Sequence, residues 1–113
     1  MELTIVQADD RLLRVKLMGR LDVAGVNRIS LEFARQVATR RKPTIVDLSD
    51  VEFIASLGMG MLVENAKALK RNNVRMVVAD PQQLVEEALR SAGLDAVFGI
   101  GHGPAEIEAL LTA

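Results

Sequence analysis

The fold is decided by one stretch of the chain, residues 47–63, which reads DLSDVEFIASLGMGMLV. An apolar strand runs here into a turn of small residues and then directly into a helix. The turn carries Ser56, whose hydroxyl can accept a hydrogen bond from an unpaired amide of the first helical turn and so act as an N-cap. The same amides and the positive end of the helix dipole also favour a phosphate at this point. The stretch therefore predicts that Ser56 is either a helix cap or a phosphorylated switch.

The composition limits the chain to one small domain. A chain of 113 residues buries about 65% of its unfolded surface, which is enough for a single core. Hydrophobic residues make up 50% of the chain but aromatic residues only 3%, so the core must consist of aliphatic side chains and methionine. This composition suits an α/β layer structure. We therefore expect a single domain over residues 1–113.

Charge and residue usage argue against several classes of function. Fourteen basic and fifteen acidic residues give a net charge of −1, so no excess of positive charge attracts nucleic acid. The absence of cysteine excludes disulfides, a thiol nucleophile and a cysteine-based metal site, and it fits a reducing compartment. No segment approaches the ~20 apolar residues of a membrane span, and no secretory signal is recognisable. We expect a cytoplasmic protein that binds neither nucleic acid nor membrane.

Periodic patterns predict the elements that precede the central stretch. Apolar and polar residues alternate over residues 3–5 and 13–17, which indicates an antiparallel hairpin with one solvent-exposed face. From residue 26 to residue 37 apolar residues recur at spacings of three and four, as on one side of a helix. Asp22 is the predicted N-cap of this helix. Pro43 prevents the helix from continuing.

Strands and helices are predicted to alternate from residue 44 onward. They are a strand over 44–48, a helix over 56–71, a strand over 74–79, a helix over 81–92, a short strand over 95–98 and a helix over 105–111. Asp80 is expected to cap the helix that Pro81 opens. Because crossovers between parallel strands are right-handed, we expect one mixed sheet of four to five strands with about four helices mainly on one face.

Two motifs and this order of elements resemble the STAS domain, the fold shared by bacterial anti-sigma factor antagonists and the cytoplasmic tails of sulphate transporters. The family pattern Asp-Leu-Ser, Val-x-Phe-apolar, Ser and Gly-apolar-Gly lies within residues 47–60, and a second pattern, Gly-x-Leu-Asp, is residues 19–22. The resemblance extends over essentially the whole chain. Two departures concern the turn: Ala55 replaces the acidic residue usual before the phosphoacceptor, and Leu57 replaces the hydroxyl residue usual after it. Ser56 is consequently the only hydroxyl residue in the turn.

The resemblance implies a stand-alone anti-sigma factor antagonist in a partner-switching pathway. The unmodified chain would bind a serine kinase that is also the anti-sigma factor, with an ATP-binding fold of the histidine-kinase type. Phosphorylation of Ser56 would release it, and a metal-dependent serine phosphatase would reverse the modification. Such a protein is a binding module without a cofactor, not an enzyme. The implied partner-binding residues are Asp22, Ala55, Ser56, Leu57, Gly58 and Met59.

The departures at Ala55 and Leu57 keep an alternative open. The chain also resembles the small STAS subunits of bacterial lipid-transport ATPase complexes, in which the domain is not phosphorylated. Modification of Ser56 by a kinase separates the two hypotheses.

Catalytic and nucleotide-binding patterns have simpler interpretations in this sequence. An acyl-transfer site at Ser56 would need a base, and the only histidine is His102, which lies in the glycine-rich segment 99–103. We interpret that segment as a flexible connection with an exposed histidine. Gly58 and Gly60 are not a phosphate loop, because they lie inside a predicted helix and no Gly-Lys-Ser/Thr follows.

The remaining candidate groups are three aspartates and a set of apolar residues. Asp22, Asp47 and Asp80 each have a local interpretation as a cap or strand-end residue, so we predict no metal site. The residues at 57, 59 and 61 are apolar, and their spacing of two cannot place all three on one side of a helix. At least one should be exposed, as part of an adaptable docking surface. The two glycines beside Met59 would leave the backbone open to a partner.

Overall fold

The structure is a computed structural model that describes residues 1–113. The elements, in chain order, are β1 (Glu2–Ala8), β2 (Leu13–Leu21), α1 (Val23–Arg40), β3 (Thr44–Ile54), α2 (Ser56–Lys70), β4 (Met76–Ala79), α3 (Gln83–Ser91), the short 3-10 helix η1 (Leu94–Ala96), β5 (Gly99–Gly101) and α4 (Gly103–Thr112). None of the helices combines the length and the apolar character that crossing a bilayer requires.

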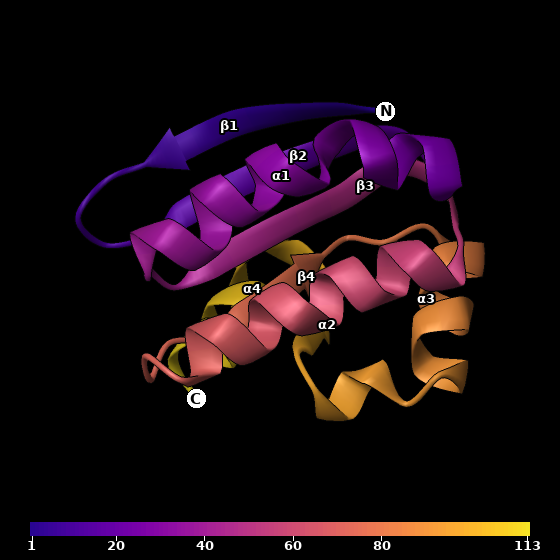
Figure 1. Ribbon diagram of the computed structural model, residues 1–113. Coiled ribbons are helices and arrows are strands. Elements are labelled where there is room, and N and C mark those ends of the chain that lie inside the picture. The colour runs from indigo at the N-terminus through magenta and orange to yellow at the C-terminus, as the bar shows by residue number, and fades with distance from the viewer.

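The five strands form one mixed sheet in the order β1-β2-β3-β4-β5. β1 is antiparallel to β2, and the other neighbouring pairs are parallel. Figure 1 shows α1 and α2 side by side over one face of the sheet, with α4 behind it. The predicted mixed α/β sheet, with its helices mainly on one face, is confirmed.

Two apolar clusters hold the layers together. The larger, with 22 buried residues, joins one face of the sheet to α1, α2 and α3. The smaller joins the other face to α4 through Ile45, Val77, Ala79 and Ile107. Because β4 is covered on both sides, all of its residues are buried, and its sequence is apolar without alternation.

Helix α1 forms as its periodicity predicts. The apolar residues at positions 26, 29, 33 and 37 are all buried. Asp22 is the N-cap, and its Oδ1 accepts a hydrogen bond of 2.8 Å from the backbone N–H of Gly25. This cap fixes the point at which the chain leaves β2 and turns into α1.

The strand that leads to Ser56 is longer than predicted. β3 extends to Ile54 because β2 pairs with it almost to its end, where Arg20 lies opposite Phe53 and Leu21 opposite Ile54. Register shifts along this pair interrupt the alternation, and the polar residues Ser49, Asp50 and Glu52 remain within the strand. The carboxyl ends of β2 and β3 therefore lie together.

The C-terminal third departs from the prediction at Asp80, at residues 95–98 and in the glycine-rich segment that follows. Asp80 does not cap α3: the helix begins at Gln83 after Gln82, and Asp80 has a φ of 52° and accepts a hydrogen bond from the N–H of Gly103. Residues 95–98 are not a strand either, because the chain from 94 to 96 is the 3-10 helix η1 and the strand follows at residues 99–101.

The glycines of the segment predicted as a flexible connection have a packing role instead. β5 pairs with β4, with Gly101 opposite Ala79. A Cβ on Gly101 would lie 2.8 Å from Cδ1 of Leu110 on α4. Small residues therefore let α4 approach this edge of the sheet closely.

Candidate functional site

Ser56 is the first residue of α2 and lies at the point where β3 ends. The backbone N–H of Ala55 donates a hydrogen bond of 3.0 Å to the carbonyl of Leu21, which fastens the turn to the end of β2. The N-cap is Ala55, and no side chain caps the helix. The predicted N-cap role of Ser56 is therefore wrong, because β3 continues to Ile54 and leaves the serine inside the helix. Its side chain is exposed.

Asp22 lies next to this turn, because Leu21 carries the carbonyl that holds Ala55. One carboxylate oxygen of Asp22 caps α1, and the other lies 3.6 Å from Nε of Arg20. The hydrogen bond from the Gly25 N–H, assisted by the charge of Arg20, lowers the pKa of Asp22 below its usual range. The carboxylate is therefore charged at neutral pH and fixed beside the turn.

The two glycines of α2 have different surroundings. Gly58 is buried, and a Cβ there would lie 2.8 Å from Cγ and 2.9 Å from the carbonyl oxygen of Leu21. Gly60 has nothing within 4 Å of the position that its Cβ would occupy. The prediction that both glycines leave the backbone open is therefore wrong for Gly58, which allows the first turn of α2 to rest on the end of β2. It holds for Gly60.

The apolar residues around Ser56 divide between the core and the surface. Met61 is buried, Met59 is half-buried against the core, and Leu57 is 46% exposed. The prediction that at least one points outward is confirmed. Leu57 forms part of the surface beside the serine.

Sequence reasoning missed Arg20, Val23 and Phe53 at the same edge of the sheet. The side chains of Val23 and Phe53 are 58% and 40% exposed, and the guanidinium carbon of Arg20 lies 4.5 Å from the centroid of the Phe53 ring. A cation on an aromatic ring at this distance is a favourable contact. The available signal was that Phe53 is the family's aromatic position in a strand whose other outward residues are polar. Exposed apolar and charged groups therefore also lie at the carboxyl ends of β2 and β3.

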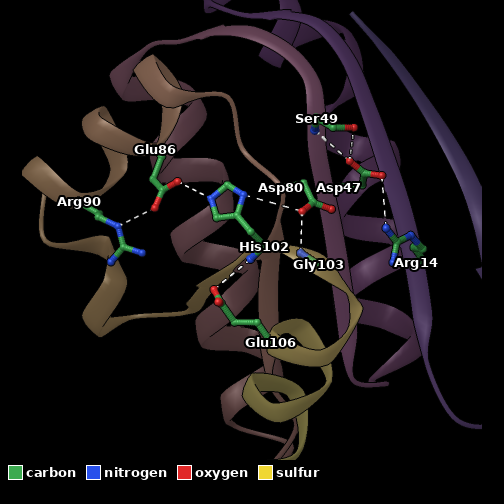
Figure 2. A network of polar contacts seen from close by, with 9 residues as sticks. All are labelled: Arg14, Asp47, Ser49, Asp80, Glu86, Arg90, His102, Gly103 and Glu106. Atoms are coloured by element: carbon green, nitrogen blue, oxygen red, sulfur yellow. Dashed lines mark hydrogen bonds and ion pairs between the residues drawn. The ribbon is translucent and has the colours of Figure 1, made fainter.

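The polar groups farther along the sheet are occupied by one another, as Figure 2 shows. Asp47 accepts hydrogen bonds from the backbone and hydroxyl of Ser49 and lies 3.5 Å from Arg14. Burial opposes ionisation of Asp47, but the bonds from Ser49 and the charge of Arg14 outweigh it and lower the pKa of Asp47. This aspartate holds the middle of β3 and is not available to a partner.

His102 joins α3 to the carboxyl end of β4. Its Nε2 contacts the carboxylate of Glu86, its Nδ1 lies 3.8 Å from Asp80, and its backbone N–H donates to Glu106 (Figure 2). Hydrogen bonds with His102 and Arg90 lower the pKa of Glu86. The ring is half exposed, as predicted, but it has these structural partners and no hydrogen bond to Ser56.

The predicted candidates thus separate into one group and two scattered aspartates. Residues 22 and 55–59 lie together at the ends of β2 and β3, while Asp47 and Asp80 have partners elsewhere. No three acidic or histidine side chains are grouped as a metal ion would require. The arrangement at Ser56 provides an accessible hydroxyl and a contact surface, without a base beside the hydroxyl.

The order and arrangement of the elements are those of a STAS domain. Residues 4–107 match the sequence profile of the STAS domain family. The chain therefore belongs to the STAS family.

Relatives of known sequence or structure carry related names. The chain is 24% identical over 102 residues to BtrV of Bordetella bronchiseptica, named as a candidate anti-sigma factor antagonist, and the match covers 90% of this chain and 87% of BtrV. A candidate anti-sigma factor antagonist of Thermotoga maritima has a similar structure, with a TM-score of 0.81 at 20% identity over 99% of this chain and 94% of the other. Phosphorylated SpoIIAA of Bacillus, a cell fate determinant, matches with a TM-score of 0.70 at 15% identity, over 91% and 92% of the two chains. These structural similarities establish the fold.

Proposed function

We propose that this chain is an anti-sigma factor antagonist that works by partner switching. The unmodified chain binds a serine kinase that is also an anti-sigma factor and displaces the sigma factor from it. Phosphorylation of Ser56 ends this interaction, and a metal-dependent serine phosphatase restores it. The contact surface consists of Asp22, Ala55, Ser56, Leu57 and Met59, and buried Gly58 supports it by letting α2 rest on Leu21.

One observation carries this proposal: Ser56 is exposed at the start of α2 without capping the helix. A kinase can reach a hydroxyl in this position, and its modification breaks no internal hydrogen bond. The unpaired amides of the first turn and the helix dipole favour a phosphate there. The modified chain should therefore keep its fold while its surface changes.

The change in charge explains the release. A phosphate adds about −1.5 to −2 charges beside Leu57, which is 46% exposed. An interface that buries Leu57 would also have to bury part of this charge, which costs free energy unless a partner cation pairs with it. Asp22 is close to the turn and adds repulsion. The modified surface therefore disfavours the complex that the unmodified surface favours.

The chain itself acts as a substrate and a binding module, not as an enzyme. The imidazole of its single histidine contacts Glu86 and Asp80, so it does not serve as a base for Ser56. The proposed mechanism needs no cofactor and involves neither nucleic acid nor membrane. We propose that it operates in the cytoplasm, where the kinase and its ATP are present.

Reconstitution with a serine kinase of the anti-sigma factor type from the same organism tests the proposal. After incubation with ATP, intact-mass analysis should reveal one added phosphate on the wild type and none on Ser56→Ala. Both unmodified proteins should bind the kinase, and the phosphorylated wild type should not. A wild type that gains no phosphate and does not bind would contradict the proposal and favour the subunit of a lipid-transport ATPase complex.

A further inference from the structure

Gly60 is placed where a helix has no structural need for glycine. It lies inside α2, its φ is not positive, and nothing lies within 4 Å of the position of a Cβ. Glycine weakens a helix relative to alanine, because it loses more backbone entropy on folding. At Gly58, two residues earlier, close packing on Leu21 offsets the same loss of entropy. The absence of a side chain at Gly60 therefore points to something outside the chain that uses the space.

A groove lies at this position, between α1 and α2, which run side by side in Figure 1. It has a volume of about 620 Å³, and Leu57, the neighbour of Ser56, is part of its lining. The side chains of Leu31 and Leu57 line it and are 69% and 46% exposed. Apolar side chains left in water on both helices can gain free energy by burial against a partner. We call this depression the α1–α2 groove.

The charge of the groove limits what can occupy it. Glu64 is the single ionisable residue in its lining, among apolar residues and the neutral side chains of Asn27, Ser30 and Asn65. Glu64 is exposed and forms no ion pair within the chain. An occupant that buries the groove must leave this carboxylate hydrated or supply a cation for it. A basic group on the occupant is therefore favoured over an acidic one.

We infer that the α1–α2 groove receives an amphipathic helix of the kinase partner. The apolar side of that helix packs between Leu31 and Leu57 over Gly60, and a lysine or arginine on it faces Glu64. A groove between two packed helices accepts the ridge of a third, and an apolar helix face is the usual ligand of such a groove. The identity of the partner rests on the proposed function.

The position of the groove connects it to the switch. Leu57 lines one end of the groove and is the neighbour of Ser56 in the first turn of α2. A helix that contacts Leu57 in the groove therefore lies close to the Ser56 hydroxyl and to a phosphate attached there. The basic residue that faces Glu64 lies farther along α2, so recognition and release use different parts of one interface.

Filling the groove tests the inference without damaging the fold. Gly60→Leu places a side chain in open space and replaces glycine with a better helix former, so its thermal midpoint should be at least that of the wild type. Its affinity for the kinase, measured by calorimetry, should fall at least about tenfold. Gly60→Ala, which adds only a Cβ, should weaken binding less than Gly60→Leu does.

Further variants test for nonspecific hydrophobic binding and for the role of charge. Thr39→Leu adds an exposed leucine on α1 outside the groove lining and should leave the affinity unchanged. Glu64→Lys should weaken binding by about tenfold, and Glu64→Gln should weaken it less and reduce its salt dependence. Glu64→Lys also keeps the inference testable if Gly60→Leu does not fold.

The possible results separate the two proposals. If the kinase phosphorylates Ser56 while Gly60→Leu and Glu64→Lys bind with wild-type affinity, the groove inference is wrong and the proposed function stands. If the wild type neither binds the kinase nor gains phosphate, both fail. If sedimentation detects a dimer that Gly60→Leu abolishes, the occupant is a second copy of the chain, and the inference is again overturned.

Discussion

Two regions at the carboxyl edge of the sheet contain functional groups, and they use them in opposite ways. At the ends of β4 and β5, Asp80, Glu86 and His102 are joined to one another and to neighbouring backbone. At the ends of β2 and β3, Ser56 and Leu57 are exposed and the serine does not cap its helix. The more reactive side chains, those at the ends of β4 and β5, are the ones that already have partners within the chain.

This difference shows that a side chain without internal partners is a better mark of the candidate site than a chemically reactive side chain is. A histidine between two carboxylates resembles catalytic machinery when composition alone is considered. Here it joins α3 to the strand that precedes it, which is a structural task. The Ser56 hydroxyl has no internal hydrogen bond, so it and the exposed side chain of Leu57 are free for a partner.

Removal of the Ser56 hydroxyl should abolish the switch and leave stability nearly unchanged. Because Ser56 is not the N-cap, Ser56→Ala loses no capping bond, and we expect a stability change below about 0.5 kcal/mol. The variant should bind the kinase permanently, while Ser56→Asp should bind more weakly, though less so than the phosphorylated protein, since one carboxylate has less charge than a phosphate. Mass analysis and thermal unfolding measure the two effects. A serine phosphorylated elsewhere in Ser56→Ala would show that the assigned site is wrong.

The two glycines of α2 should respond to alanine with opposite signs. Gly58→Ala forces a Cβ to within 2.9 Å of the Leu21 carbonyl oxygen and should destabilise the fold by about 1–3 kcal/mol. Gly60→Ala meets open space and should stabilise the fold by up to about 1 kcal/mol. Urea unfolding of both variants measures the difference. Equal changes would mean that α2 does not rest on the end of β2 as described.

An acidic residue at position 55 should sense the phosphate. Ala55 is the N-cap of α2 without a capping side chain, so Ala55→Asp should supply a cap and stabilise the unmodified protein by about 0.5–2 kcal/mol. In the phosphorylated protein, repulsion between two anions should cancel part of this gain. The thermal midpoint of the phosphorylated form should therefore be lower, relative to the unmodified form, in Ala55→Asp than in the wild type. Equal shifts in both forms would contradict the electrostatic account of release.

The same two regions differ in how well the sequence predicts them. The β2–α1 and β3–α2 connections follow from local patterns: the stripe of α1, the cap at Asp22 and the motif around Ser56. The main error there, the capping role of Ser56, arose because β3 extends through pairing with β2, which no local pattern encodes. Burial of Gly58 and exposure of Gly60 depend likewise on what lies opposite them.

The C-terminal region was predicted less well, because its contacts join residues distant in the sequence. Asp80 looked like a cap beside Pro81, but its carboxylate is used by Gly103, twenty-three positions away. The strand predicted at 95–98 lies instead at 99–101, because the glycines there allow β5 to lie under α4. Local propensity cannot reveal such partners. The contacts of His102 belong to the same class.

The weakest expected effect concerns the pH dependence of the His102 region. Hydrogen bonds with His102 and Arg90 lower the pKa of Glu86 from an ordinary value of 4.5, so the folded state favours the charged carboxylate. A carboxyl group of this kind contributes stability above the unfolded pKa, and the contribution is lost as the pH falls through the folded pKa. Because the group is near the surface, we expect less than about 1 kcal/mol. Glu86→Gln should lower the thermal midpoint at pH 7. The difference from the wild type should become smaller when the pH falls below 4.5, the ordinary pKa of a glutamate.

The adjacent Glu87 provides the matched control, because it pairs with no cation and its hydrogen bond from Gln83 can persist in Glu87→Gln. Glu87→Gln should therefore follow the wild type at every pH. The kinase affinity of Glu86→Gln should also equal that of the wild type, because the two regions are separate in function. A loss of kinase binding in Glu86→Gln at neutral pH, without loss of fold, would mean that the contacts of His102 also serve the partner. The carboxyl ends of β4 and β5 would then also take part in partner binding, and the contrast between the two regions would be wrong.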